Sequence, residues 1–153
     1  MQREEVVVPE WIEYFMGISE EISKRSPDAQ TKVGAVIVTQ SNEMVTTGYN
    51  GFVRGIDASS LPNLRPGKYD WMIHAERNAI LSAARQGKSI VGCKSYSTYR
   101  PCLQCSQDLW QAGITEVYYP ASSVCNKGQK PEEEAKIELF YSLIGDKMKF
   151  IGV

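Results

Sequence analysis

The chain has 153 residues, of which 42% are hydrophobic, and a formal net charge of −1. This length and hydrophobic content suit the core of one ordinary domain, so we expect residues 1–153 to form a single domain. The nearly neutral charge argues against a broad surface for duplex nucleic acid and favours a small anionic ligand held by a local basic pocket. No segment is long enough to span a membrane or to act as a signal peptide, which predicts a soluble, cytoplasmic protein without a membrane partner.

The first half of the chain predicts a helix, a hairpin and a long connection. Apolar residues recur at helical spacing over residues 11–25. The β-branched runs at 33–38 and 44–49 are separated by polar residues 40–43, a pattern typical of two antiparallel strands. Residues 50–70 are rich in Gly, Pro, Asn and Asp and are unusually long for a connection in a compact domain. We therefore expect this irregular segment to have a function.

The second half alternates between strand and helix patterns. Its first helix is expected over 75–86, with Gly87 as the stop. The further expected elements, in chain order, are a strand at 93–99, a helix at 102–112, a strand at 116–119, a helix at 132–144 and a strand at 148–153. Strands separated by helices continue a sheet in parallel. The pattern predicts a three-layer α/β/α fold, a mixed five-stranded sheet with helices on both faces.

His74 and Glu76 stand together at the start of the helix expected over 75–86. His74 is the only histidine of the chain. Residues two apart do not share a face inside a helix, so the pair belongs at a helix start. There His74 can bind a metal ion while Glu76 reaches the open coordination position.

Cys102 and Cys105 are three residues apart, about one helical turn, so both sulfur atoms can point at the same ion. Pro101 is a suitable residue for entry into that turn. A position at a helix N-terminus favours the thiolate form that zinc requires. One histidine and two cysteines leave a fourth coordination position for water, which is the arrangement of a catalytic rather than a structural zinc site.

Two thiolates cancel the formal charge of the ion, so this site should acidify water less than a site with three histidines. A nearby base is then needed, and Glu76 supplies it: its carboxylate takes the water proton, passes it to the ring nitrogen and later protonates the departing amine. A C-x-x-C pair alone could be structural or redox-active, and a lone histidine is more often packed in a core. Together, H-x-E and P-C-x-x-C match the signature of zinc-dependent hydrolytic deaminases.

Several segments resemble the cytidine deaminase-like superfamily and, within it, the deoxycytidylate deaminase family. They read His-Ala-Glu-Arg-Asn-Ala-Ile at 74–80, Pro-Cys-Leu-Gln-Cys at 101–105, Val-Gly-Ala at 33–35 and Gly-Tyr-Asn-Gly at 48–51. The resemblance implies hydrolysis of dCMP to dUMP and ammonia, which feeds thymidylate synthesis. It also implies a homohexamer that dCTP activates and dTTP inhibits, with Mg²⁺ accompanying the effector triphosphate.

Four residues are candidates for contacts with the substrate. The resemblance assigns Asn50 to the deoxyribose, although Asn-Gly is also an ordinary turn pair. Tyr99 stands at a strand end before Pro101 and could stack on the pyrimidine or fill the core. Arg25 and Lys32 flank a polar turn near the expected pocket and are candidates for the 5′-phosphate, although isolated basic residues are most often solvated.

The resemblance places an effector site on the loop after Gly-Tyr-Asn-Gly and on the helix that follows His74. Its matching candidates here are Gly51, Phe52, Gly55 and Arg85. Arg85 lies about three helical turns past His74 and should face a neighbouring site rather than the zinc. The competing interpretation of Arg85 is an ordinary cation at a helix end.

Some phage members of this family hold a second, structural zinc through additional His and Cys residues in the loop before the catalytic motif. Residues 50–70 contain neither residue type, so we expect no second metal. Cys93 is expected to be buried packing and Cys125 to lie in a polar loop, and neither receives a role.

Three alternatives to dCMP as the substrate remain open: dCTP, a free nucleoside such as cytidine, and transfer RNA. A transfer-RNA enzyme should show a basic face, which the net charge does not indicate. A further alternative from another class is a zinc- or nucleotide-sensing module without turnover. Glu76 argues against that module, because zinc binding does not require its carboxylate.

Overall fold

The computed structural model describes residues 1–123 and 131–153; Cys125, expected in a polar loop, lies outside the described residues. Its helices and strands follow the predicted order closely. The helices are α1 (Trp11–Ser23), α2 (Ala75–Gln86), α3 (Leu103–Gln111) and α4 (Pro131–Ile144). The main strands are β1 (Gly34–Val38), β2 (Met44–Tyr49), β5 (Lys94–Ser97), β6 (Glu116–Tyr119) and β7 (Lys149–Gly152). Short 3-10 helices occupy Gly67–Asp70 and Gly145–Lys147.

The main sheet has five strands in the order β2-β1-β5-β6-β7. Strand β1 is antiparallel to both β2 and β5, while β5, β6 and β7 run parallel. The predicted hairpin and its parallel continuation are both confirmed. This direction puts the carboxyl end of β5 and the amino ends of α2 and α3 on one side of the molecule, where the candidate ligands lie.

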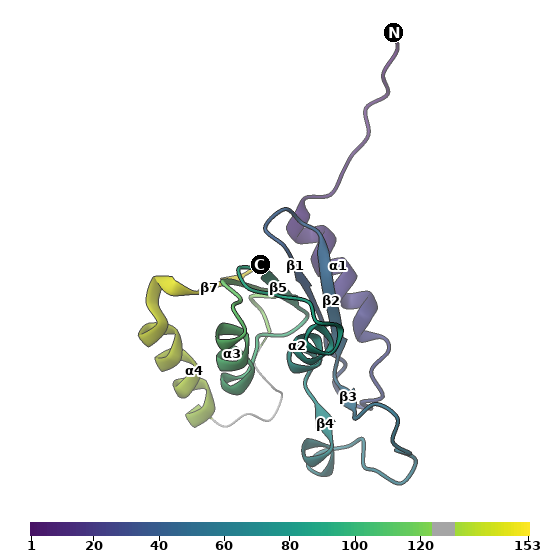
Figure 1. Cartoon of the computed structure of the whole chain (residues 1–153), viewed down its shortest axis with the longest axis vertical. Helices are drawn as coiled ribbons and strands as arrows, with labels where there is room; N and C mark the ends of the chain where they lie inside the picture. Colours follow the sequence, from purple (N-terminus) through teal and green to yellow (C-terminus); the bar gives the residue numbers. More distant parts are fainter. Residues whose placement is uncertain (124–130) are drawn as a thin grey trace.

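Helices cover both faces of this sheet, as predicted (Figure 1). Alternate residues of β1 enter different cores because side chains of a strand point to opposite faces. Val36 and Val38 pack with Phe15 of α1, whereas Ala35 and Ile37 join the core that contains residues of α2 and α3. Helix α1 therefore covers one face, and α2 and α3 cover the other.

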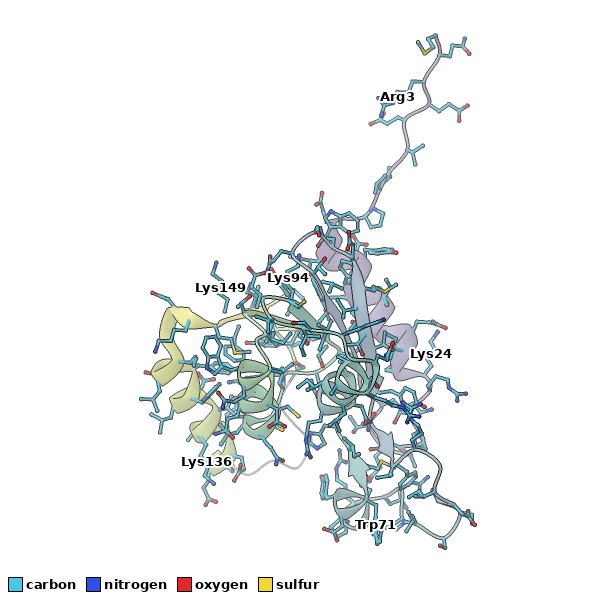
Figure 2. All side chains as sticks on the ribbon, in the orientation of Figure 1. Arg3, Lys24, Trp71, Lys94, Lys136 and Lys149 are labelled. Atoms are coloured by element: carbon cyan, nitrogen blue, oxygen red, sulfur yellow. The ribbon has the colours of Figure 1, made fainter. Side chains whose placement is uncertain are left out.

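Residues 50–70 are irregular over most of their length, as predicted, but short elements lie at both ends of the segment. Strand β3 (Gly51–Phe52) pairs antiparallel with β4 (Met72–Ile73), and the 3-10 helix Gly67–Asp70 precedes β4. This small sheet extends away from the main sheet (Figure 1), and its tip carries Trp71 (Figure 2). Two-residue strands carry no periodicity, so a pattern search cannot find them. Among the described residues, no helix is long and apolar enough to cross a membrane.

Gly48 of β2 allows α2 to lie close to the sheet. A Cβ at this position would be 2.3 Å from the Ala75 carbonyl oxygen and 2.4 Å from the Ala79 nitrogen, both backbone atoms of α2. Gly48→Ala is therefore expected to lower the free energy of unfolding by about 1 to 3 kcal/mol through overpacking, as measured by urea denaturation. Gly17→Ala is the control, because a Cβ at this helical position meets nothing within 4 Å and should stabilise α1. Equal stabilities of the two variants would contradict this account of the close approach.

Candidate metal centre and active site

Three metal-binding side chains come from the starts of two neighbouring helices. His74 is the N-cap of α2 and Cys102 is the N-cap of α3, both with extended backbone, and Cys105 lies in the first turn of α3. The His74 side chain makes no capping hydrogen bond. Its ring is therefore free to face the two sulfur atoms from across the gap between the helices.

The distances between these side chains fit a zinc ion. His74 Nδ1 lies 3.5 Å from Cys102 Sγ and 3.4 Å from Cys105 Sγ, and all three ligand atoms lie within 4.8 Å of one another. In a tetrahedral site, Zn–N and Zn–S bonds of about 2.1 and 2.3 Å place nitrogen and sulfur about 3.6 Å apart. The three predicted ligands are thus brought together in the separation that the metal requires, and a tetrahedral ion held by them would have one coordination position open for water.

Local hydrogen bonds favour a thiolate at Cys102. Hydrogen bonding from Cys105, followed by that from His74, lowers the pKa of Cys102 to about 4; the Cys105 backbone N–H donates to Cys102 Sγ at 3.4 Å. The same contact with Cys102, together with burial, raises the pKa of the Cys105 thiol. The pKa of His74 is also raised, mainly by the hydrogen bond between the His74 ring and Cys102. The cluster therefore carries negative charge on sulfur, which matches the demand of a dication.

Glu76 lies in the first turn of α2, beside the ligands, and is only 4% exposed. Burial raises the pKa of its carboxyl group. Ser97 at the end of β5 donates a hydrogen bond from Oγ to Glu76 Oε1 at 3.1 Å. A carboxylate with a raised pKa is a stronger base than a solvated one and can later return the proton, so Glu76 has the properties of a proton carrier.

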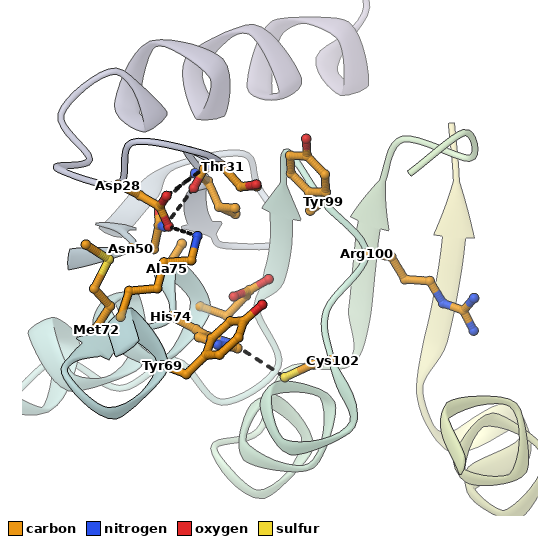
Figure 3. A pocket seen from close by; sticks show the side chains of 13 residues that line it. Asp28, Thr31, Asn50, Tyr69, Met72, His74, Ala75, Tyr99, Arg100 and Cys102 are labelled. Atoms are coloured by element: carbon orange, nitrogen blue, oxygen red, sulfur yellow. Dashed lines mark hydrogen bonds and ion pairs between the residues drawn. The ribbon is translucent and has the colours of Figure 1, made fainter. Parts of the chain in front are cut away.

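One pocket is lined by His74, Glu76 and Cys102 of this centre and by two of the predicted substrate residues (Figure 3). Tyr99 lies just after the end of β5, and its side chain is on the pocket wall opposite His74 (Figure 3). Asn50 lies at the other end of the pocket, where its side chain is held by three hydrogen bonds to Asp28, Thr31 and Val33. The pocket is lined by Asp28, Thr31, Val33, Asn50, Lys68, Tyr69, Met72, His74, Ala75, Glu76, Tyr99, Arg100 and Cys102.

The remaining predicted residues lie elsewhere. Arg25 and Lys32 are exposed and are not among the described residues that line this pocket. Phe52 and Arg85 line a second cavity between β2, α2 and the small sheet, together with Arg54. The other two effector candidates, Gly51 and Gly55, are not among the residues lining that cavity.

Sequence reasoning missed a buried ion pair at the far end of the pocket. Lys68 Nζ lies 2.6 Å from Asp28 Oδ2, and both residues are nearly fully buried. Burial by itself would raise the pKa of Asp28, but hydrogen bonds from Lys68 and from the backbone N–H groups of Thr31 and Gln30 outweigh it, and the pKa is lowered. Asp28 lies just after α1 and Lys68 in the long connection, so no spacing rule pairs them.

Nothing in the sequence indicated the contact of Arg100 with helix α4 either. Arg100 lies next to the Pro-Cys-x-x-Cys segment at the edge of the pocket, and its guanidinium extends towards α4 (Figure 3). There it pairs with Glu134 and Glu138 and stacks on the ring of Tyr141, with its guanidinium carbon 4.9 Å from the ring centroid. Arg100 thus attaches the segment that carries Cys102 to α4.

Comparison with known proteins supports this interpretation of the site. The family model described as "Cytidine and deoxycytidylate deaminase zinc-binding region" matches residues 9–121. The deoxycytidylate deaminase of Mus musculus is 35% identical over 142 residues, which cover 89% of this chain and 76% of the mouse protein. That of Homo sapiens is 34% identical with the same coverage. The matched region contains every candidate ligand and Glu76.

Solved structures lead to the same group. The dCMP deaminase of cyanophage S-TIM5, in complex with dCMP and dUMP, has a TM-score of 0.71 and 25% identity, covering 97% of this chain and all of the phage chain. Its apo form has a TM-score of 0.69 and 27% identity, covering 95% of this chain and all of the phage chain. A transfer-RNA deaminase is 20% identical with a TM-score of 0.58, which shows the shared fold alone.

Proposed function

The chain belongs to the cytidine and deoxycytidylate deaminase family, and from this premise we propose that it hydrolyses dCMP to dUMP and ammonia and so feeds thymidylate synthesis. One observation carries the proposal: three zinc-binding side chains form one cluster, and two of them, His74 and Cys102, line a pocket together with the buried Glu76. In the balanced reaction, water supplies the new carbonyl oxygen at C4, the C4–N bond breaks, and the amine leaves as ammonia.

His74, Cys102 and Cys105 would hold the zinc ion, and zinc when bound lowers the pKa of water so that hydroxide is available near neutral pH. Glu76 accepts the proton that the water loses. It donates this proton to the ring nitrogen next to C4, then takes the second proton of the attacking water and delivers it to the amine as the C4–N bond breaks. The Ser97 hydroxyl holds the Glu76 carboxylate over the pocket through its hydrogen bond.

Two contacts with the substrate complete this proposal. Asn50 Oδ1 accepts one hydrogen bond, from the Val33 N–H, and a carbonyl oxygen has a second lone pair that a deoxyribose hydroxyl could use. Tyr99 lies on the pocket wall and would stack on the pyrimidine. These roles place the base at the metal centre and the sugar towards Asn50.

We also propose the regulation that the family resemblance implies. The chain would act in the cytoplasm, as one deaminase domain, in a homohexamer that dCTP with Mg²⁺ activates and dTTP inhibits. Gly51, Phe52, Gly55 and Arg85 would hold the effector. The second cavity supports this for Phe52 and Arg85, because Arg54 adds a second cation that suits a polyphosphate.

A panel of substrates tests the proposed reaction. Purified zinc-loaded protein should release ammonia from dCMP faster than from dCTP, cytidine or transfer RNA, and ultraviolet absorbance follows the same conversion. Addition of dCTP with Mg²⁺ should raise the rate and dTTP should lower it. Release of ammonia only from RNA would overturn the assigned substrate, and stoichiometric binding of zinc and nucleotide without any turnover would indicate a sensing module.

A further inference from the structure

At the end of the pocket away from the metal centre, the carboxylate of Asp28 already has hydrogen-bond partners at every acceptor position. Asp28 accepts four hydrogen bonds: from the backbone N–H groups of Gln30 and Thr31, from Asn50 Nδ2 and from Lys68 Nζ. A carboxylate offers about four lone-pair positions. Asp28 is therefore fully occupied and has no acceptor left for a ligand.

Lys68 beside it still has donors to offer. Its side chain is almost completely buried and lines the pocket. Among the described residues, it donates one hydrogen bond, to Asp28, and its ammonium lies 5.9 Å from the centroid of the Tyr69 ring. An ammonium group has three donors. Two of them are thus left in a site where bulk water is largely excluded, and an unused buried donor is costly.

Arg65 adds further donors at the same place. Its Nε donates to the Tyr69 hydroxyl at 2.8 Å and its Nη2 to Thr31 Oγ1 at 2.9 Å, and both partners line the pocket. A guanidinium has five N–H donors, so three are unused by these contacts. Thr31 Oγ1 accepts from Arg65 and can still donate its own hydroxyl hydrogen.

We call Thr31, Arg65 and Lys68 the donor cluster. Its unused hydrogen-bonding positions are mainly donors, and two of its three side chains are positively charged. Only the Lys68 charge is offset, by the ion pair with Asp28. A neutral sugar would leave most of these donors unused, whereas a phosphate dianion presents oxygens that only accept. Thr31 and Lys68 line the same pocket as His74 and Cys102, and Arg65 is hydrogen-bonded to Thr31 and Tyr69 of that lining. Asp28 and Thr31 lie at one end of the pocket and Cys102 at the other (Figure 3).

We propose that Lys68 and Arg65, supported by Thr31, bind the 5′-phosphate of the substrate and make the enzyme select a nucleoside monophosphate over the free nucleoside. This inference rests on the proposed function, because it assumes that a cytosine ring occupies the metal centre. It assigns the phosphate to Lys68, which lines the pocket, and to Arg65, which is hydrogen-bonded to two residues of the lining. These two replace Arg25 and Lys32, whose side chains are exposed.

The test compares kcat/KM for dCMP with kcat/KM for deoxycytidine, which differs only by the phosphate. Arg65→Gln is expected to lower this ratio by about 10- to 100-fold, the effect of a lost charged hydrogen bond. Lys68→Gln alone would leave Asp28 as an unpaired buried charge and disturb folding. The informative variant is therefore Asp28→Asn combined with Lys68→Gln, which removes both charges of the buried pair together, and it should lower the ratio by a similar factor relative to the wild-type protein.

Lys24→Gln is the matched control, because it removes one positive charge from an exposed position at the end of α1 (Figure 2) and should leave the ratio as it is. The assignment is overturned if Arg65→Gln and the combined variant keep the ratio, or if Arg25→Gln or Lys32→Gln lowers it instead. A wild-type protein that fails to deaminate dCMP would overturn the proposed function, which is a separate result.

Discussion

Replacing Glu76 with glutamine is expected to lower kcat/KM for dCMP by about 10²- to 10⁴-fold while zinc remains bound. The amide keeps the size of the side chain but cannot carry a proton from water to the ring nitrogen and the amine. Stability should be equal or higher, because burial disfavours the charged carboxylate and glutamine carries no charge. The measurements are ammonia release, zinc content and the thermal unfolding midpoint of the same preparations.

Glu13→Gln is the control for this experiment. Glu13 also lies in the first turn of a helix, α1, but is exposed, so its replacement should change none of the three measurements. Turnover by Glu76→Gln at the wild-type rate would remove Glu76 from the mechanism. Loss of zinc together with turnover would instead assign it to the metal site.

Replacing either cysteine ligand should have the second large effect. Cys102→Ser and Cys105→Ser are each expected to bind zinc substoichiometrically and to show ammonia release at the assay background. Serine retains a hydroxyl proton near neutral pH and is a poor zinc ligand, whereas Cys102 has a pKa lowered to about 4 and is ready to bind the ion. Metal analysis after dialysis, followed by the dCMP assay, measures both effects.

Cys93→Ala provides the comparison for the cysteine variants. Cys93 is buried and belongs to the core around α2 and α3, so its replacement should cost some stability but leave stoichiometric zinc. Full zinc content and turnover in Cys102→Ser or Cys105→Ser would show that the three side chains do not form the metal site.

The metal centre was predictable because its residues fall in two short motifs and its chemistry is restrictive. Cys102 and Cys105 are separated by one helical turn, and His74 and Glu76 require a helix start. The strand and helix patterns placed both segments at helix N-termini, which the structure confirms. Local rules of this kind carry over directly from sequence to structure.

The far end of the pocket could not be predicted in this way. The Asp28–Lys68 pair joins residues 40 positions apart, and each looks like a solvated residue in a polar turn. Arg65 is similar, because its contacts with Thr31 and Tyr69 exist only after the chain folds back through β3 and β4. Arg25 and Lys32 looked equally suitable in the sequence, and only tertiary structure separates exposed cations from buried ones.

The most direct test of the central claim is to follow ammonia release from dCMP while zinc is removed and returned. Wild-type protein is expected to lose turnover when a chelator removes the ion and to regain it when stoichiometric zinc is restored. Glu76→Gln should regain zinc without regaining turnover. Continued deamination of dCMP by protein shown to be free of metal would contradict the claim that zinc and Glu76 act together.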